Sequence, residues 1–149
     1  MIQLNNINAK IKKFILDLKI DEIQNERLKI IDKIGKSINR NIMNDSFPNI
    51  LFVCSHNSRR SQFAEIWAHT INYIFNNKIK IMSAGTFKTA VHYQVINVIK
   101  DAGFKIRKKE NNYYLNFSNH CKDIKIYSKK INDINTNNSS IIINTCSNA

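Results

Sequence analysis

Apolar residues recur at helical spacing in two groups within residues 1–46, which predicts two helices joined by a turn near Ile20. The first stripe consists of Ile7, Ile11, Phe14, Ile15 and Leu18, and the second of Leu28, Ile31, Ile34, Ile38 and Ile42. Asp21 together with Gln24 resembles a capping arrangement for the second helix. We therefore expect an N-terminal helical hairpin that packs on the rest of the chain or on a second subunit.

A buried strand followed by a helix is predicted in the middle of the chain. Residues 50–53 form an apolar run between Pro48 and a polar segment, which is typical of a buried strand. Helical spacing returns from Arg59 onward, with the apolar face formed by Phe63, Ile66, Trp67, Thr70, Ile71 and Ile74. Residues 78–82 then predict a second strand. A helical crossover of this length joins parallel neighbours, so the pattern predicts an α/β fold with a parallel sheet.

The second half of the chain predicts one more helix and several short strands. The helix is marked by Val91, Val95, Val98, Ile99 and Ala102, and Gly103 ends it at the C′ position. Residues 112–117 and 123–127 predict an edge β-hairpin, residues 129–140 a polar loop, and residues 141–144 a buried strand. This last strand would deliver Cys146 to the sheet edge where the strand of residues 50–53 ends.

Composition narrows the classes of protein to consider. With 149 residues, of which 43% are hydrophobic, the chain can bury one substantial core. It has no apolar run of membrane-spanning length and no signal-like N-terminus, so a cytoplasmic protein is expected. Its three cysteines are widely spaced and match neither a disulfide framework nor a zinc pattern. His69 and His120 lack partners at ligand spacing, so no metal site is predicted.

The net charge of +12 leaves two interpretations open. It is compatible with a basic nucleic-acid-binding protein, although residues 105–109 are only a short basic cluster without interleaved aromatic residues. It also fits a general abundance of Ile, Lys and Asn along the whole chain. In either case a positive field favours acidic or phosphorylated substrates. No membrane partner is expected, and nucleic-acid binding is kept only as an alternative function.

Candidate chemistry is concentrated in the segment between the predicted strand and helix. A loop that leads into a helix start directs free backbone N–H groups at its centre, which suits a tetrahedral oxyanion. The same field lowers the pKa of a thiol, so Cys54 is the expected nucleophile. Arg60 can bind two oxygens of the anion, and the Ser61 hydroxyl can donate to the sulfur. The expected oxyanion-binding residues are Ser55, His56, Asn57, Ser58, Arg59 and Arg60, with Asn57 in the left-handed backbone region.

The segment from Cys54 to Ser61 resembles the phosphate-binding loop of the low-molecular-weight protein tyrosine phosphatases and the thioredoxin-coupled arsenate reductases. Residues 83–86 (Ser-Ala-Gly-Thr) resemble that family's turn after its second strand, where Gly85 either permits close backbone approach or belongs to an ordinary turn. Residues 145–149 (Thr-Cys-Ser-Asn-Ala) resemble the arsenate-reductase segment that carries a second redox cysteine.

This resemblance implies a three-layer α/β fold with a parallel twisted sheet of phosphotyrosine-phosphatase type I (flavodoxin-like) topology. Residues 47–149 would form the catalytic domain and residues 1–46 a helical extension. The implied function is that of a cysteine-dependent oxyanion enzyme, with Cys54, Arg60, Ser61 and Cys146 as catalytic residues. Phosphate, arsenate or phosphotyrosine would be the substrate. No cofactor is implied, but arsenate reduction would need thioredoxin or another thiol reductant.

The sequence also departs from the family pattern. His56 stands where many relatives have glycine, and we expect it to line the pocket mouth. The family takes its general acid from an Asp-Pro element, whereas this sequence has only one proline, Pro48, and no aspartate after Asp133. We therefore expect the family's last strand and helix to be missing and release of a tyrosyl group to slow by about 10²–10⁴-fold. A catalytically impaired oxyanion-binding remnant stays open as an alternative function.

Two further side chains, those of His92 and Cys121, are expected to be exposed to solvent. His92 lies at the start of the fourth predicted helix, where we expect an exposed first-turn histidine, with contact to substrate as the alternative. Cys121 lies at the tip of the predicted hairpin and is expected to be an exposed thiol without a role.

Overall fold

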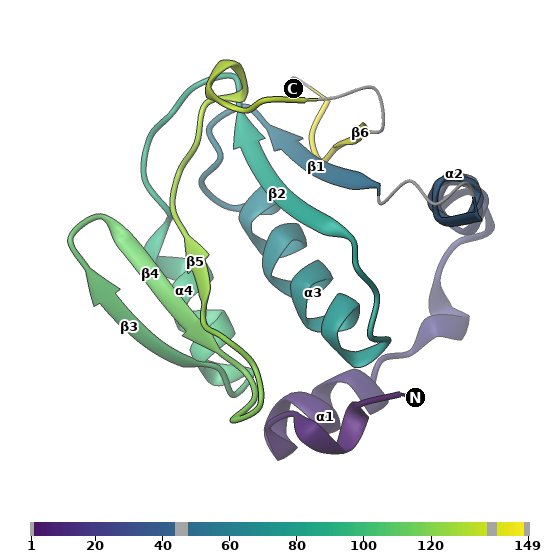
Figure 1. Cartoon of the computed structure of the whole chain (residues 1–149), viewed down its shortest axis with the longest axis horizontal. Coiled ribbons are helices and arrows are strands. Elements are labelled where there is room, and N and C mark those ends of the chain that lie inside the picture. The colour runs from purple at the N-terminus through teal and green to yellow at the C-terminus, as the bar shows by residue number, and fades with distance from the viewer. Residues whose placement is uncertain (1, 44–47, 137–139, 148–149) are drawn as a thin grey trace.

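The computed structural model describes residues 2–43, 48–136 and 140–147 (Figure 1). Its elements are, in chain order, η1 (Leu4–Asn6), α1 (Ala9–Leu16), η2 (Ile20–Glu22), α2 (Asn25–Met43), β1 (Asn49–Cys54), α3 (Arg60–Ile74), β2 (Lys80–Gly85), α4 (Tyr93–Asp101), β3 (Lys105–Lys109), β4 (Asn112–Asn116), β5 (Ile124–Ile126), η3 (Ile131–Asp133) and β6 (Ser140–Asn144). Among the described residues, no helix is both long and apolar enough to cross a membrane.

The predicted parallel α/β architecture is confirmed, and its topology is of the flavodoxin-like type. The sheet has the order β2-β1-β6, with β1 parallel to both neighbours. Helix α3 connects β1 to β2 and packs against both strands (Figure 1). Cys54 at the end of β1 is the register partner of Gly85 at the end of β2, so the carboxyl ends of the strands share one edge of the sheet.

Two details of this sheet differ from the prediction. Residues 83–85, expected in a turn, belong to β2, because Ala84 and Gly85 continue the ladder with Val53 and Cys54. Strand β6 was expected to be buried, yet Ile142 is 53% exposed. The reason is its outer position in the sheet, which leaves a run of isoleucines only partly covered.

The predicted hairpin of residues 112–117 and 123–127 is present as the antiparallel pair β4 and β5. Its expected place at the edge of the parallel sheet was wrong, because β4 also pairs with β3 in a separate three-stranded sheet of order β3-β4-β5. Strand β3 escaped prediction because Lys-Ile-Arg-Lys-Lys offers a single apolar residue, so its pairing with β4 decides its conformation. Past β5, Lys130 forms a parallel bridge with Gly85, which joins the second sheet to the first.

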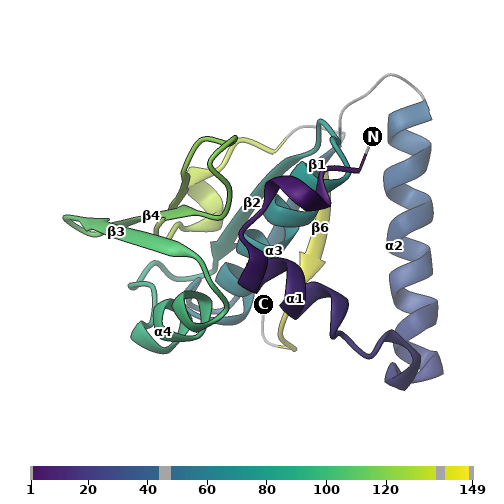
Figure 2. The same ribbon diagram turned by 90° about the horizontal axis from the view of Figure 1, so that it is seen from below.

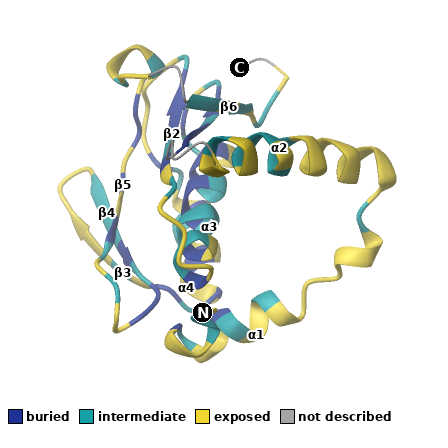
Figure 3. Cartoon of the chain, turned by 45° about the vertical axis from the view of Figure 1, so that its right-hand side comes forward, coloured by how far each residue is buried: buried dark blue, intermediate teal, exposed yellow. Residues whose placement is uncertain are grey.

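The N-terminal helices form as predicted but do not lie side by side as a hairpin (Figures 2 and 3). Helix α1 packs on the rest of the chain through Ile11, which is 0% exposed, and through Phe14, whose ring stacks on Trp67 at 4.9 Å. Helix α2 has no buried residue among those described, and only residues in its C-terminal half, such as Ile34 and Ile38, are half-buried (Figure 3). Burial against the rest of the chain is therefore confirmed for α1.

The core consists of two clusters on either side of the sheet. The larger cluster joins α1, α3, α4 and the antiparallel sheet through Ile11, Ile66, Val95, Ile99, Phe104, Leu115 and Ile126, among others. The smaller one contains Leu51, Val53 and Ala84, with Ile131 and Ile134 packed on them. The helix predicted to end at Gly103 does so, and the φ of +110° at Gly103 explains the glycine. A Cβ there would also lie 2.9 Å from Lys10 Cβ, so the turn fits closely against α1.

Candidate active site

Cys54 closes β1 and lies at the base of a short loop that runs into the first turn of α3. It is only 4% exposed. Arg59, the residue before the helix, makes no side-chain hydrogen bond to cap it. The first N–H groups of α3 are therefore available to a group held inside the loop, as expected for an anion-binding helix start.

The thiol of Cys54 experiences two opposed effects. Burial raises the pKa of Cys54, while hydrogen bonds from the Ser61 hydroxyl and from the backbone N–H groups of Ser61, Ser58 and His56 lower it. The hydrogen bonds prevail, and the pKa of Cys54 is lowered from its usual value. A lowered thiol pKa raises the thiolate fraction at neutral pH, which is the reactive form.

The hydroxyl of Ser61 lies 3.0 Å from Cys54 Sγ, and the surrounding bonds determine which atom donates. The backbone N–H of Lys129 donates to Asn57 Oδ1 at 2.7 Å, which fixes the orientation of the amide. Asn57 Nδ2 then donates to Ser61 Oγ at 2.9 Å and to Ser83 Oγ at 2.8 Å. Because Ser61 Oγ accepts from Asn57, its own hydrogen is directed at the sulfur. Asn57 has φ +45°, the left-handed conformation predicted for it.

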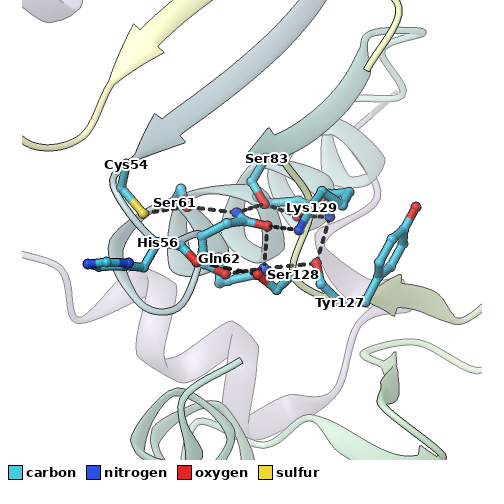
Figure 4. A network of polar contacts seen from close by, with 10 residues as sticks. Cys54, His56, Ser61, Gln62, Ser83, Tyr127, Ser128 and Lys129 are labelled. Carbon is cyan, nitrogen blue, oxygen red and sulfur yellow. Dashed lines mark hydrogen bonds and ion pairs between the residues drawn. The ribbon is translucent and has the colours of Figure 1, made fainter. Parts of the chain in front are cut away.

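A buried ion pair of Lys129 and Glu65 adjoins this amide, and Figure 4 shows Lys129 next to Ser83. The Lys129 ammonium lies 3.0 Å from Glu65 Oε2, with side-chain exposures of 8% and 5%. Ser83, which accepts from Asn57, donates in turn to the Glu65 carboxylate at 2.5 Å. Burial raises the pKa of Glu65, and Lys129 and Ser83 offset part of that rise. Hydrogen bonds thus run from the buried pair through Ser83, Asn57 and Ser61 to the sulfur.

The end of β2 and the residues directly after it hold the backbone of the loop from the side of the second strand. A Cβ on Gly85 would lie 2.5 Å from the backbone nitrogen of Asn57, so only glycine allows the two chains to approach this closely. Of the two readings of Gly85, close approach is therefore confirmed. Phe87 N donates to Ser55 O at 2.8 Å, and Thr86 Oγ1 donates to the same oxygen at 2.9 Å. These bonds fix the backbone that surrounds Cys54.

Cys146 reaches the same end of the sheet. Thr145 donates to Val53 O through its backbone N–H at 2.7 Å and through its hydroxyl at 2.8 Å, and so holds the segment after β6 beside β1. Cys146 Sγ then lies 3.5 Å from Ser55 Oγ, on the residue that follows Cys54. The structure thus brings a second thiol to the loop, as the strand pattern predicted.

The charged residues of the loop point outward. Arg60 is the first residue of α3, and it and Arg59 are both exposed. His56 is also exposed and stacks on Phe87 at 5.7 Å, which places it at the rim of the loop. The hydroxyl of Ser58 donates to Ala90 O at 2.7 Å and so bonds the loop to the segment that follows β2.

The structure also bears on the predictions for His92, Cys121 and a metal site. His92 is half-buried rather than exposed: its Nδ1 accepts from Gln94 N, and its backbone N–H donates to Ser58 O at 3.0 Å. Cys121 is half-buried against the larger core cluster, and burial raises its pKa. Its expected exposure was wrong because the turn folds back onto the core. No group of three His, Cys, Asp or Glu residues that could hold a metal occurs in the described part of the chain.

Sequence reasoning missed the support of the loop, in particular Gln62, Glu65, Ser83 and Lys129. Gln62 Nε2 donates to Asn57 O and to Tyr127 O, both at 3.0 Å. A signal was present, since Gln62, Glu65 and His69 are polar residues at helical spacing beside the apolar face of α3. Polar residues at buried helix positions need partners, and here the partners come from β2 and from the segment after β5.

A parallel α/β fold whose first strand ends in a thiol of lowered pKa, surrounded by N–H groups, is the arrangement of a cysteine-based phosphatase. The family model described as low molecular weight phosphotyrosine protein phosphatase matches residues 49–149, and the chain belongs to this family. It is thus a member of a family of cysteine-based phosphatase and arsenate-reductase type. No match was found among the curated proteins compared with it.

Proposed function

We propose that the protein hydrolyses phosphate monoesters of the phosphotyrosine type, with Cys54 as the nucleophile. The observation that carries this proposal is the lowered pKa of a cysteine that is only 4% exposed. Burial without donors would keep that sulfur protonated, so the converging N–H groups of His56, Ser58 and Ser61 provide a site for negative charge. The same donors suit the oxygens of a bound phosphate.

The proposed reaction has two steps. The Cys54 thiolate attacks phosphorus, the phosphorus–oxygen bond to the leaving group breaks, and a phosphocysteine forms. Water then attacks the phosphorus and releases inorganic phosphate and the thiolate. Arg60 turns inward and binds two phosphoryl oxygens, while Ser61 stabilises the thiolate in both the free and the regenerated enzyme. This chemistry requires no metal or organic cofactor.

Reduction of arsenate is a second candidate, favoured by the position of Cys146 beside Ser55. Cys54 attacks arsenate and water leaves, which gives a thiol–arsenic(V) adduct. The Cys146 thiolate then attacks the Cys54 sulfur, a Cys54–Cys146 disulfide forms, and the electron pair of the sulfur–arsenic bond reduces arsenic to arsenite. Thioredoxin or another thiol would have to reduce the disulfide. In either reaction we propose residues 47–149 as the catalytic domain and residues 1–46 as an extension.

Paired assays test both activities. Hydrolysis of p-nitrophenyl phosphate is the first readout, because its leaving group departs without a proton. Arsenate-dependent oxidation of a dithiol is the second. We expect Cys54→Ser to abolish both activities and Cys146→Ser to abolish only the second, with Cys121→Ser as the matched control that retains both. A wild-type protein that binds phosphate but turns over neither substrate would contradict an enzymatic role and leave an oxyanion-binding function.

A further inference from the structure

A groove of about 310 Å³ opens beside the Cys54 loop and extends over the antiparallel sheet. One wall is the segment that follows β2, with Lys88 and Thr89. The other is the β3–β4 hairpin, with Lys108 and Tyr113, and residues Tyr127 and Ser128 close the end. None of these residues belongs to the loop from Cys54 to Arg60, so the groove is distinct from the proposed reaction site.

One wall and the end of the groove are hydrogen-bonded directly to that loop. Thr89 Oγ1 donates to His56 O at 2.9 Å, and Ser128 Oγ donates to the same oxygen at 3.3 Å. Thr89 N in turn donates to Ser128 Oγ at 3.0 Å, which links the first wall to the end of the groove. The N–H of His56 belongs to the donors that lower the pKa of Cys54. The groove therefore adjoins the backbone of the Cys54 loop, and a peptide whose phosphorylated residue lies in the loop would have this groove next to it.

The groove is positively charged. Lys88 and Lys108 line it, and its lining includes no carboxylate. Within the described ranges neither ammonium has an ion-pair partner. The neighbouring Arg107 differs, because it is paired with Asp123 at 2.6 Å. Two uncompensated ammonium groups on opposite walls favour a ligand that carries negative charge along its length.

The aromatic rings distinguish between two kinds of anionic chain. Single-stranded nucleic acids bind by stacking their bases on open aromatic faces. Here lysine ammonium groups already lie over the rings: Lys108 is 5.6 Å from the ring centroid of Tyr113, and Lys129 is 4.4 Å from that of Tyr127. The amides of Asn111 and Asn112 also line the groove, and they offer both donors and acceptors to a peptide backbone.

We propose that this groove binds an acidic peptide segment next to the phosphorylated residue that the Cys54 loop holds. The proposal rests on the proposed phosphatase function and deepens it, because it makes the acidic flank of a phosphopeptide the determinant of specificity. Lys88 and Lys108 would be the specificity-determining residues. They act on the flank and not on the phosphoryl group, so small aryl phosphates would not distinguish their variants from the parent protein.

The test compares two fluorescent phosphotyrosyl peptides that are identical except for a flanking run of glutamate or of glutamine. Their affinities for the full-length Cys54→Ser protein are measured by anisotropy. We expect the glutamate peptide to bind about 3- to 10-fold more tightly, with the preference shrinking as salt is raised. Adding Lys88→Gln and Lys108→Gln should bring the ratio close to unity. The matched control, Lys29→Gln with Lys33→Gln on exposed positions of α2, should keep the preference.

Equal binding of the two peptides, or a preference that survives loss of both groove lysines, would overturn the proposal. So would a single-stranded oligonucleotide that competes as well as the glutamate peptide and depends on the same lysines. Failure of the phosphatase function gives a different pattern. In that case p-nitrophenyl phosphate is not hydrolysed by the wild-type protein, yet unphosphorylated glutamate and glutamine peptides still differ in affinity through Lys88 and Lys108, which would support the groove alone.

Discussion

Two thiols in this protein, Cys54 and Cys121, are shielded from solvent, and burial raises the pKa of each. Their pKa values nevertheless shift in opposite directions. Cys54 receives the Ser61 hydroxyl and several loop N–H groups, and its pKa is lowered even though it is the more deeply buried thiol. At Cys121 the hydrogen bonds offset only part of the effect of burial, and the pKa is raised. The hydrogen bonds outweigh burial at Cys54, whereas burial together with the charge of Asp123 outweighs them at Cys121, so burial alone does not decide the direction of a thiol's pKa shift.

The supports of the two thiols differ in the same way. The turn that carries Cys121 rests on the larger apolar cluster. The Cys54 loop rests on a buried polar network that ends in the pair of Glu65 and Lys129. An apolar support keeps a turn in place, whereas a polar one also fixes the direction of each donor. The following predictions test this difference between the two thiols and their supports, in order of decreasing effect.

Removal of the buried ammonium should be the most damaging change. Lys129→Met leaves the Glu65 carboxylate buried without its partner, and we expect the free energy of unfolding to fall by about 3–5 kcal/mol. Urea unfolding measures this loss. The matched control is Lys19→Met, which breaks a pair with Glu22 whose side chains are 73% and 67% exposed. That change should cost at most about 1 kcal/mol. Similar losses for the two variants would show that the buried pair stabilises the fold no more than the exposed pair does.

The influence of the network on His69 predicts a pH dependence of stability. Burial, and then the charge of Lys129, lowers the pKa of His69 from 6.5 to about 4. Between these values the unfolded chain binds a proton that the folded chain does not, so stability falls as the pH falls through this window. The loss should reach roughly 2–3 kcal/mol near pH 4. Urea unfolding of the wild type and of His69→Gln measures it, and equal pH slopes for the two proteins would refute the assignment.

Alkylation compares the two thiols directly. In a Cys146→Ser background at about pH 6, we expect iodoacetamide to modify Cys54 about 10- to 100-fold faster than Cys121, because a lowered pKa raises the thiolate fraction. Peptide mapping by mass spectrometry gives both rates in one sample. Phosphate or arsenate should protect Cys54 and leave Cys121 unaffected. Equal rates, or no protection, would remove the basis for assigning Cys54 as the nucleophile.

The smallest effect concerns a single donor. Ser61→Ala removes the hydroxyl that points at the sulfur, and we expect the pKa of Cys54 to rise, with about tenfold slower alkylation at low pH. Ser58→Ala is the matched control, since the hydroxyl of Ser58 bonds to Ala90 and its backbone N–H is retained. The pH profile of alkylation distinguishes the two variants, and an equal shift in both would contradict the direction assigned to the Ser61 hydroxyl.

Local patterns in the sequence were sufficient for much of this architecture. The apolar run before Cys54, the helical spacing after Arg59 and the glycine at position 103 each describe an interaction between residues close in the chain. They predicted the strand, the loop, the helix and the helix end. The same local reasoning placed Asn57 in left-handed backbone and Cys146 at the edge of the sheet that holds Cys54, because parallel strands align their carboxyl ends.

Tertiary structure alone decided the rest. Strand β3 has no apolar pattern of its own and exists through its pairing with β4. The partners of Asn57 come from Ser83 and Lys129, which are distant in sequence, and no spacing rule connects residues across two sheets. The groove beside the loop likewise forms only where the segment after β2 meets the β3–β4 hairpin. A sequence specifies directly what neighbours along the chain do, whereas the environment of a buried charge depends on which distant segments the packed core brings together.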